Sequence, residues 1–210
     1  MIAAGLDPGA PQPGTVSPQP TNKAAAALLQ KKEELLIQML IRHGEKIMCN
    51  VEDDDGNEQP LTVIDFIRYS LEQDGLCLRT PVFARILDEA IEHSTDEGFR
   101  ASRYFENHPD ETVSRISMSL AHDNETLSKI HSRIKAPVTD EERLVELLPH
   151  MMTDYKLAIV EDLISNLMAE LRKPDVVADK VKFLALMKKI QDSKQTQREL
   201  ARQCGDRVLQ

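Results

Sequence analysis

The sequence predicts an all-α fold, a helical bundle followed by a long C-terminal helical hairpin. Hydrophobic residues make up 41% of the 210 residues but aromatic residues only 4%, so a core would consist mainly of Leu, Ile, Val and Met. Apolar residues recur at three- and four-residue spacing in successive segments that carry helix start and stop signals. No segment alternates β-branched and polar residues as a strand does.

Composition divides the chain into three parts. Residues 1–20 hold five of the eleven prolines and three of the eight glycines, and such a segment buries too little apolar area to offset the entropy of ordering. We therefore predict a disordered linker over residues 1–21. A helical bundle subdomain is expected over residues 22–136, and a long helix with a terminal helical hairpin over residues 137–210.

The bundle begins with strong helix formers from residue 21 to residue 43, and Gly44 supplies a stop. The next segment, "CNVEDDDGNEQP", is predicted to be an acidic loop. Its three Asp could suggest calcium, but Gly56 does not fall where an EF-hand requires a glycine, so the calcium interpretation is the weaker one.

Two further helices have clear start signals. Thr62 and Asp65 have the spacing of a capping box, and Gly75 ends the apolar run that follows. Thr80 before Pro81 predicts an N-cap with proline in the first turn. The expected buried faces are Val63, Phe66, Ile67 and Leu71 in the first of these helices and Phe83, Ile86, Leu87, Ala90 and Ile91 in the second.

The stretch "RYFENHPDE" can be a functional site or a joint between helices. His108 beside Asp110 could act in catalysis or bind a metal, but no HExxH occurs and no Glu lies three residues before a His. Pro109 disfavours helix in the residue before it, and the acidic Asp110 and Glu111 suit the first turn of a new helix. A short helix over residues 101–107, a break at His108 and a second helix are the favoured interpretation.

The C-terminal part is predicted to be two long helices around a sharp turn at residues 173–175. Thr139 and Glu142 form a capping box at the start, and Pro149 should kink or split the first helix. The second helix is expected over about residues 175–203. The predicted inner faces are Leu148, Met152, Tyr155, Ile159, Leu163 and Leu167 in the first helix and Val177, Val181, Leu184, Met187 and Ile190 in the second.

Charge separates this C-terminal arm from the rest. The formal net charge is −9, but residues 172–210 contain ten Lys and Arg against five Asp and Glu, a charge of +5. Residues 1–171 contain 16 Lys and Arg against 30 Asp and Glu, a charge of −14. The balance argues against a general nucleic-acid binder, and the basic arm is either a solvated helix face or a surface that attracts an acidic protein.

Other classes of protein are disfavoured by what the sequence lacks. No Walker or GxGxxG loop, nucleophile elbow or Cys/His zinc set is present, so no cofactor and no metal are expected. Three widely spaced Cys predict reduced thiols in a cytoplasm rather than a disulfide framework. No apolar run reaches the 18–20 residues that span a bilayer, and no signal peptide is evident, so no membrane contact is expected.

Two stretches resemble the C-terminal domain of bacterial DnaG-type DNA primases. The short aromatic helix followed by "NHPDETVSRISMSLA" is similar to that family's phenylalanine, His-Pro-Asp joint and Ile/Leu-rich helix. The ending "KFLALMKKIQDSKQTQRELARQCGDRVL" resembles its paired lysines, basic helix, Gly and Arg before a short apolar finish. The resemblance covers about residues 22–210, and its motifs are structural rather than catalytic.

The resemblance implies a non-catalytic module that docks a primase onto the hexameric replicative DNA helicase during DNA replication. The zinc-binding domain and the metal-binding carboxylate core of a primase are not visible here. The catalytic part would lie on the same protein, joined through the proline-rich start. Little direct nucleic-acid binding is expected. We expect the helicase to contact the basic arm through Lys188, Lys189, Lys194, Arg198, Arg202, Val208 and Leu209.

Two alternatives stay open at this stage. A helicase's own N-terminal, primase-interacting domain is similar in fold to the primase module, although no ATPase motif follows here and the basic hairpin favours the primase. An unrecognised helical-bundle enzyme would need clustered ionisable residues. The six His, at positions 43, 93, 108, 122, 131 and 150, are scattered singly.

Overall fold

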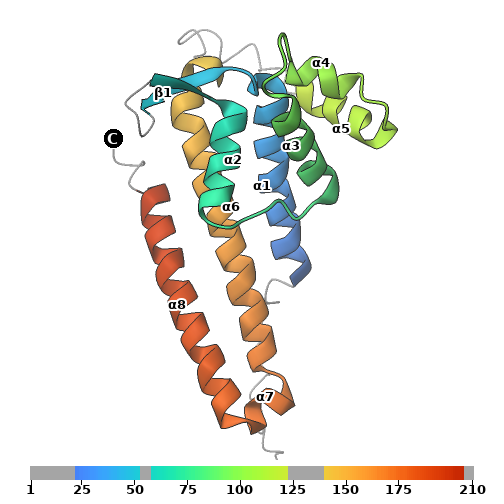
Figure 1. Ribbon diagram of the computed structural model, residues 1–210. Coiled ribbons are helices and arrows are strands. Elements are labelled where there is room, and N and C mark those ends of the chain that lie inside the picture. The colour runs from blue at the N-terminus through green and yellow to red at the C-terminus, as the bar shows by residue number, and fades with distance from the viewer. Residues whose placement is uncertain (1–21, 53–57, 123–139, 206–210) are drawn as a thin grey trace, which may run out of the picture.

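The computed structural model describes residues 22–52, 58–122 and 140–205. It confirms the helical fold class: eight helices and one two-stranded sheet make up these residues, with the C-terminal helices forming a long arm (Figure 1). The elements are α1 (Asn22–His43), β1 (Ile47–Glu52), β2 (Glu58–Thr62), α2 (Val63–Gln73), α3 (Pro81–His93), α4 (Ala101–Glu106), α5 (Glu111–Ala121), α6 (Asp140–Leu171), α7 (Pro174–Ala178) and α8 (Lys180–Gly205).

The acidic segment after α1 is a β-hairpin, so the prediction of a loop there was wrong. β1 and β2 pair antiparallel, with Asn50 opposite Pro60 and Glu52 opposite Glu58. Most residues of both strands are exposed. A strand with no buried face has no reason to alternate apolar and polar residues, so the pattern used to detect strands is missing here.

The bundle is organised around α1, which contacts each of the helices α2 to α6. Its inward residues Leu36, Ile37, Leu40 and Ile41 are fully buried. The same core continues along the first half of α6 through Leu148, Met152 and Tyr155. Because the core needs α6, the bundle and the arm share one helix. The boundary predicted between residues 136 and 137 lies outside the described residues.

Several predicted helix boundaries are confirmed. The Thr62 hydroxyl accepts a hydrogen bond from the Asp65 amide at 3.2 Å and caps α2. Gly75, with φ of 61°, follows the end of α2. At the His-Pro-Asp joint, Asp110 is the N-cap of α5 rather than part of its first turn, and its carboxylate accepts from the Thr112 amide at 2.8 Å.

The cap of α3 comes from a residue that lies far away in the sequence. Glu33 of α1, 1% exposed, accepts hydrogen bonds from the amides of Arg79 at 2.6 Å and Thr80 at 3.0 Å. Thr80 occupies the predicted N-cap position, but its hydroxyl donates to Glu33 instead of capping its own helix. A carboxylate at the start of a helix also complements the helix dipole. Glu33 therefore ties α3 to α1.

Tyr155 of α6 completes this buried polar cluster. Its hydroxyl lies 3.1 Å from Glu33 Oε1 and 3.0 Å from the Cys77 carbonyl oxygen, both of which can accept its one hydrogen. Burial and the neighbouring Glu33 charge raise the pKa of Tyr155 well above its ordinary value, so the hydroxyl stays protonated as a donor. Asp162, also on α6, pairs with Arg79 in the same turn. The cluster thus joins α1, the turn before α3, and α6.

The helix α6 is not split by Pro149 but runs from residue 140 to residue 171 with the proline inside it. It changes partner along its length, from α1 in the bundle to α8 in the arm. One continuous stripe therefore cannot describe its buried face, and Leu163, predicted to face inward, is 44% exposed. The predicted Thr139–Glu142 capping box lies outside the described residues.

The second half of the arm departs most from the predicted pattern. The chain breaks at Asp179, whose carboxylate accepts from the Val181 and Lys182 amides and starts α8. Of the five residues predicted to face inward, only Ile190 is buried. The small arm core instead consists of Leu167, Val176, Leu186 and Ile190. Apolar residues cover α8 on all sides over its first turns, so spacing alone could not select the inner face.

Replacing Glu33 with Ala should destabilise the fold by about 3 kcal/mol or more, because the Arg79 and Thr80 amides and the Thr80 hydroxyl would lose a buried acceptor. Urea unfolding measures this. Glu34→Ala is the matched control, since Glu34 is the next residue of α1 and is exposed. It should change the free energy of unfolding by no more than about 0.5 kcal/mol. Equal effects of the two substitutions would contradict the capping role of Glu33.

Candidate functional site

An open groove of about 510 Å³ runs along the outer face of α8. We call it the α8 groove. It is lined by Leu184, Met187, Lys188, Ile190, Gln191, Lys194 and Arg198. Except for Ile190, which borders the arm core, these residues follow one another at intervals of three, one, three, three and four, which places them on one helix face.

The end of the groove nearest the turn of the arm is apolar and exposed. Leu184 is 58% exposed and Met187 is 45% exposed. Val177 on α7 and Val181 at the start of α8, which do not line the groove, are also exposed, at 59% and 78%. These are four of the five residues predicted to lie inside the hairpin. Contiguous exposed apolar side chains of this kind mark interaction surfaces.

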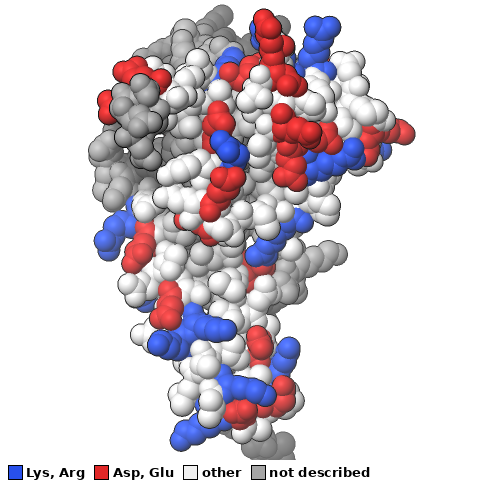
Figure 2. All heavy atoms as spheres, in the orientation of Figure 1, with Lys and Arg blue, Asp and Glu red and all other residues white. Residues whose placement is uncertain are grey.

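The other end of the α8 groove is basic. Lys188, directly after Met187, and Lys194 and Arg198 farther along line this basic part; they are three of the predicted partner-binding residues and have no ion-pair partner among the described residues. Figure 2 shows both Lys and Arg and Asp and Glu, interspersed with uncharged surface, over the lower part of the molecule, which contains the turn of the arm. The groove therefore combines apolar contact area with uncompensated positive charge.

The other predicted partner-binding residues do not line this groove. Lys189 lies about 160° around the helix from Gln191, on another side of α8. Arg202 follows Arg198 by one turn, beyond the lining. Val208 and Leu209 lie outside the described residues. Leu184, Met187 and Gln191 were not predicted as site residues, although their three- and four-residue spacing to Lys188, Lys194 and Arg198 was a usable signal.

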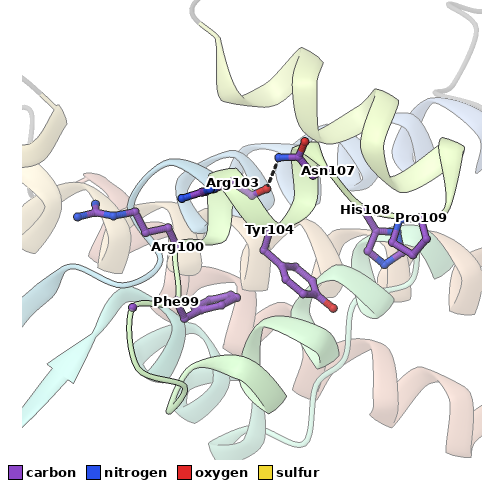
Figure 3. A pocket seen from close by; sticks show the side chains of 8 residues that line it. Phe99, Arg100, Arg103, Tyr104, Asn107, His108 and Pro109 are labelled. Carbon is purple, nitrogen blue, oxygen red and sulfur yellow. Dashed lines mark hydrogen bonds between the residues drawn. The ribbon is translucent and has the colours of Figure 1, made fainter.

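A second pocket, of about 580 Å³, lies at the "RYFENHPDE" stretch (Figure 3). It is lined by Gly98, Phe99, Arg100, Arg103, Tyr104, Asn107, His108 and Pro109. In Figure 3, Arg100 and Arg103 extend away from His108, and the Tyr104 ring lies between Phe99 and His108. The rings of Tyr104 and Phe105 meet edge to face, with centroids 4.9 Å apart. Much of this aromatic surface is therefore used in packing.

His108 is held as a structural residue at this pocket. Its side chain is 3% exposed. The Asp110 amide donates to Nδ1 at 3.0 Å, so the proton is assigned to Nε2, which lies 2.9 Å from Glu89 Oε2. Both ring nitrogens are therefore engaged in linking α3 to the start of α5. This arrangement supports the joint interpretation over a catalytic or metal-binding one.

Arg85 and Glu89 extend this link across the surface of α3. Arg85 pairs with Glu89 at 2.8 Å and with Asp110 at 2.6 Å. Burial pushes the pKa of Glu89 up, but hydrogen bonds from Arg85 and His108 outweigh burial and hold it below the ordinary 4.5. The Thr112 amide and Arg85 likewise hold the pKa of Asp110 below its ordinary value. The charged network favours the folded state near neutral pH.

Two kinds of site are absent from the parts of the chain that the structure describes. No three His, Cys, Asp or Glu side chains come together there as a metal site would require. No helix in these parts is long and apolar enough to cross a membrane.

Comparison with known proteins places the chain in a family. The model of a family described as "Domain of unknown function (DUF8430)" matches residues 18–208, so the chain belongs to this family. No curated protein matches the chain. No solved structure matches it either.

Because of the Glu89 network, the free energy of unfolding should depend on pH in the acidic range. Because the folded-state pKa of Glu89 is depressed, its contribution is present above about pH 4.5 and is lost as the pH falls through the lowered value. Glu89→Gln should therefore be less stable than the wild type at pH 7, with the difference shrinking toward pH 3. Urea unfolding across this range measures it. Glu92→Gln, an exposed neighbour on α3, is the control, and a difference that stays constant with pH would contradict the assignment.

Proposed function

We propose that this chain is the C-terminal, non-catalytic module of a bacterial DnaG-type primase and docks that enzyme onto the hexameric replicative DNA helicase. The observation that carries the proposal is the α8 groove, an apolar and basic surface on an arm that projects from an acidic bundle. Interfaces are typically built this way, with apolar anchors for affinity and charge for orientation and rate of association. The resemblance of the joint and of the C-terminal ending to the primase family supplies the identity of the partner.

The remaining features agree with such a module. The catalytic part would be joined in cis through the proline-rich residues 1–21, and the module itself would hold no cofactor. A replication protein of this kind acts in the cytoplasm, where free thiols such as Cys49 and Cys77 stay reduced. An acidic bundle repels nucleic acid, so the module is proposed to contribute little direct binding to DNA.

The direct test is to mix the chain with a purified bacterial hexameric replicative helicase and to measure complex formation by light scattering after size exclusion. A stable complex, weakened by added salt, is expected because the basic groove contributes to association. Mixing the same chain with an isolated primase catalytic part tests the alternative, in which the chain is a helicase domain that binds the primase. Binding to the primase part and not to the helicase would overturn the proposal in favour of that alternative.

The chain alone should make no RNA primers from single-stranded template, nucleoside triphosphates and Mg²⁺. The reason is that the residues implied for primer synthesis belong to other domains of the resembling family. Denaturing gels of radiolabelled products give the measurement, with a complete primase as the positive control. Template-dependent RNA from the purified chain would show that the module is itself catalytic.

A further inference from the structure

The α8 groove has the dimensions of a site for one helix. From Leu184 to Arg198 the lining spans fourteen residue steps, which is about 21 Å along the axis, or four helical turns. Apart from Lys188 and Ile190, the lining residues sit at alternating spacings of three and four, and such rows are the ridges and grooves into which a second helix packs. Next to the groove, α8 packs on the arm core through Leu186 and through Ile190, which also borders the groove. A helix laid in the groove would make the two-helix arm a three-helix unit.

The groove is also polarised along its length. Leu184 and Met187 leave about one turn of apolar surface near the turn of the arm. Lys188, Lys194 and Arg198 follow toward the bundle, and none of them has an ion-pair partner among the residues that the structure describes. Elsewhere on α8, Lys182 does pair, with Asp179 at 3.6 Å. Of the six Lys and Arg of α8 that have no ion pair among the described residues, three line the groove and three, Lys180, Lys189 and Arg202, do not.

We infer that a single amphipathic, acidic helix of the helicase binds in the α8 groove. This inference rests on the proposed function. Its apolar residues, spaced at i, i+3/i+4 and i+7, pack on Leu184 and Met187. Its Asp and Glu residues, on the same face, pair with Lys188, Lys194 and Arg198. This mode is the helix-in-groove recognition in which apolar anchors give affinity and charges set register and direction.

Substitutions on α8 test the groove with a built-in control. In the full chain, Leu184→Asp and the pair Lys188→Glu with Lys194→Glu should each weaken binding to the hexameric helicase by about tenfold or more. The charge-reversed pair should also flatten the salt dependence of the association rate. Lys189→Glu reverses one charge, half the change of the pair, on the residue next to Lys188 but outside the groove, and should alter affinity by less than about twofold. All these side chains are exposed, and circular dichroism melting checks that the variants stay folded.

A photoreactive benzophenone amino acid in place of Gln191 identifies the occupant. Crosslinking to the helicase followed by mass spectrometry should place the attached peptide in a helical segment with apolar residues at three- and four-residue spacing and Asp or Glu on the same face. Attachment to a basic or non-helical segment would overturn the inference. So would crosslinking of the chain to a second copy of itself, with a matching dimer in sedimentation.

The outcomes separate this inference from the proposed function. If the wild type binds the helicase and the groove variants bind equally well, the groove is not the docking site, while the helicase-docking function stands. If the wild type does not bind the helicase at all, both statements fail. If the groove variants lose binding and Lys189→Glu retains it, both are supported.

Discussion

The buried carboxylate of Glu33 is the interaction on which the rest of the structure depends. It satisfies amides at the start of α3, accepts the Thr80 hydroxyl and lies within hydrogen-bonding distance of Tyr155 on α6. An isolated buried charge would be costly, but here several donors compensate it. Because one end of this cluster is on α6, the bundle fixes the helix that carries the arm. The direction in which α8 presents its groove is set by that anchoring.

The arm is held together differently from the bundle. Its apolar core is small, made of Leu167, Val176, Leu186 and Ile190 near the turn. Farther along, α6 and α8 meet through polar contacts, such as Gln197 with Glu161 at 3.3 Å and Cys204 with Asp154 at 3.3 Å. The exposed apolar residues of α8 are not needed for this packing. They stabilise the arm little, so their presence is better explained by a partner.

Short sequence patterns predicted the helices and their ends well. They did not predict the contacts between residues that lie far apart in the sequence. Thr62, Gly75 and Asp110 act within a few residues of themselves, so short sequence patterns identify the helix boundaries that they make. The cap that Glu33 gives to α3 spans more than forty residues and leaves no local pattern. On α8 the apolar residues surround the helix, so the choice of inner face depends on α6. The basic residues of the candidate site were found by charge, but their apolar companions were assigned to the core.

The central claim is that the outer face of α8 docks onto a hexameric replicative helicase. Hydrogen–deuterium exchange of the chain with and without the helicase tests it most directly, because burial of a surface slows exchange in the element that carries it. The account predicts added protection over residues 181–198, with α4 and α5 unchanged. Protection confined to α4 and α5, with residues 181–198 unchanged, would contradict it.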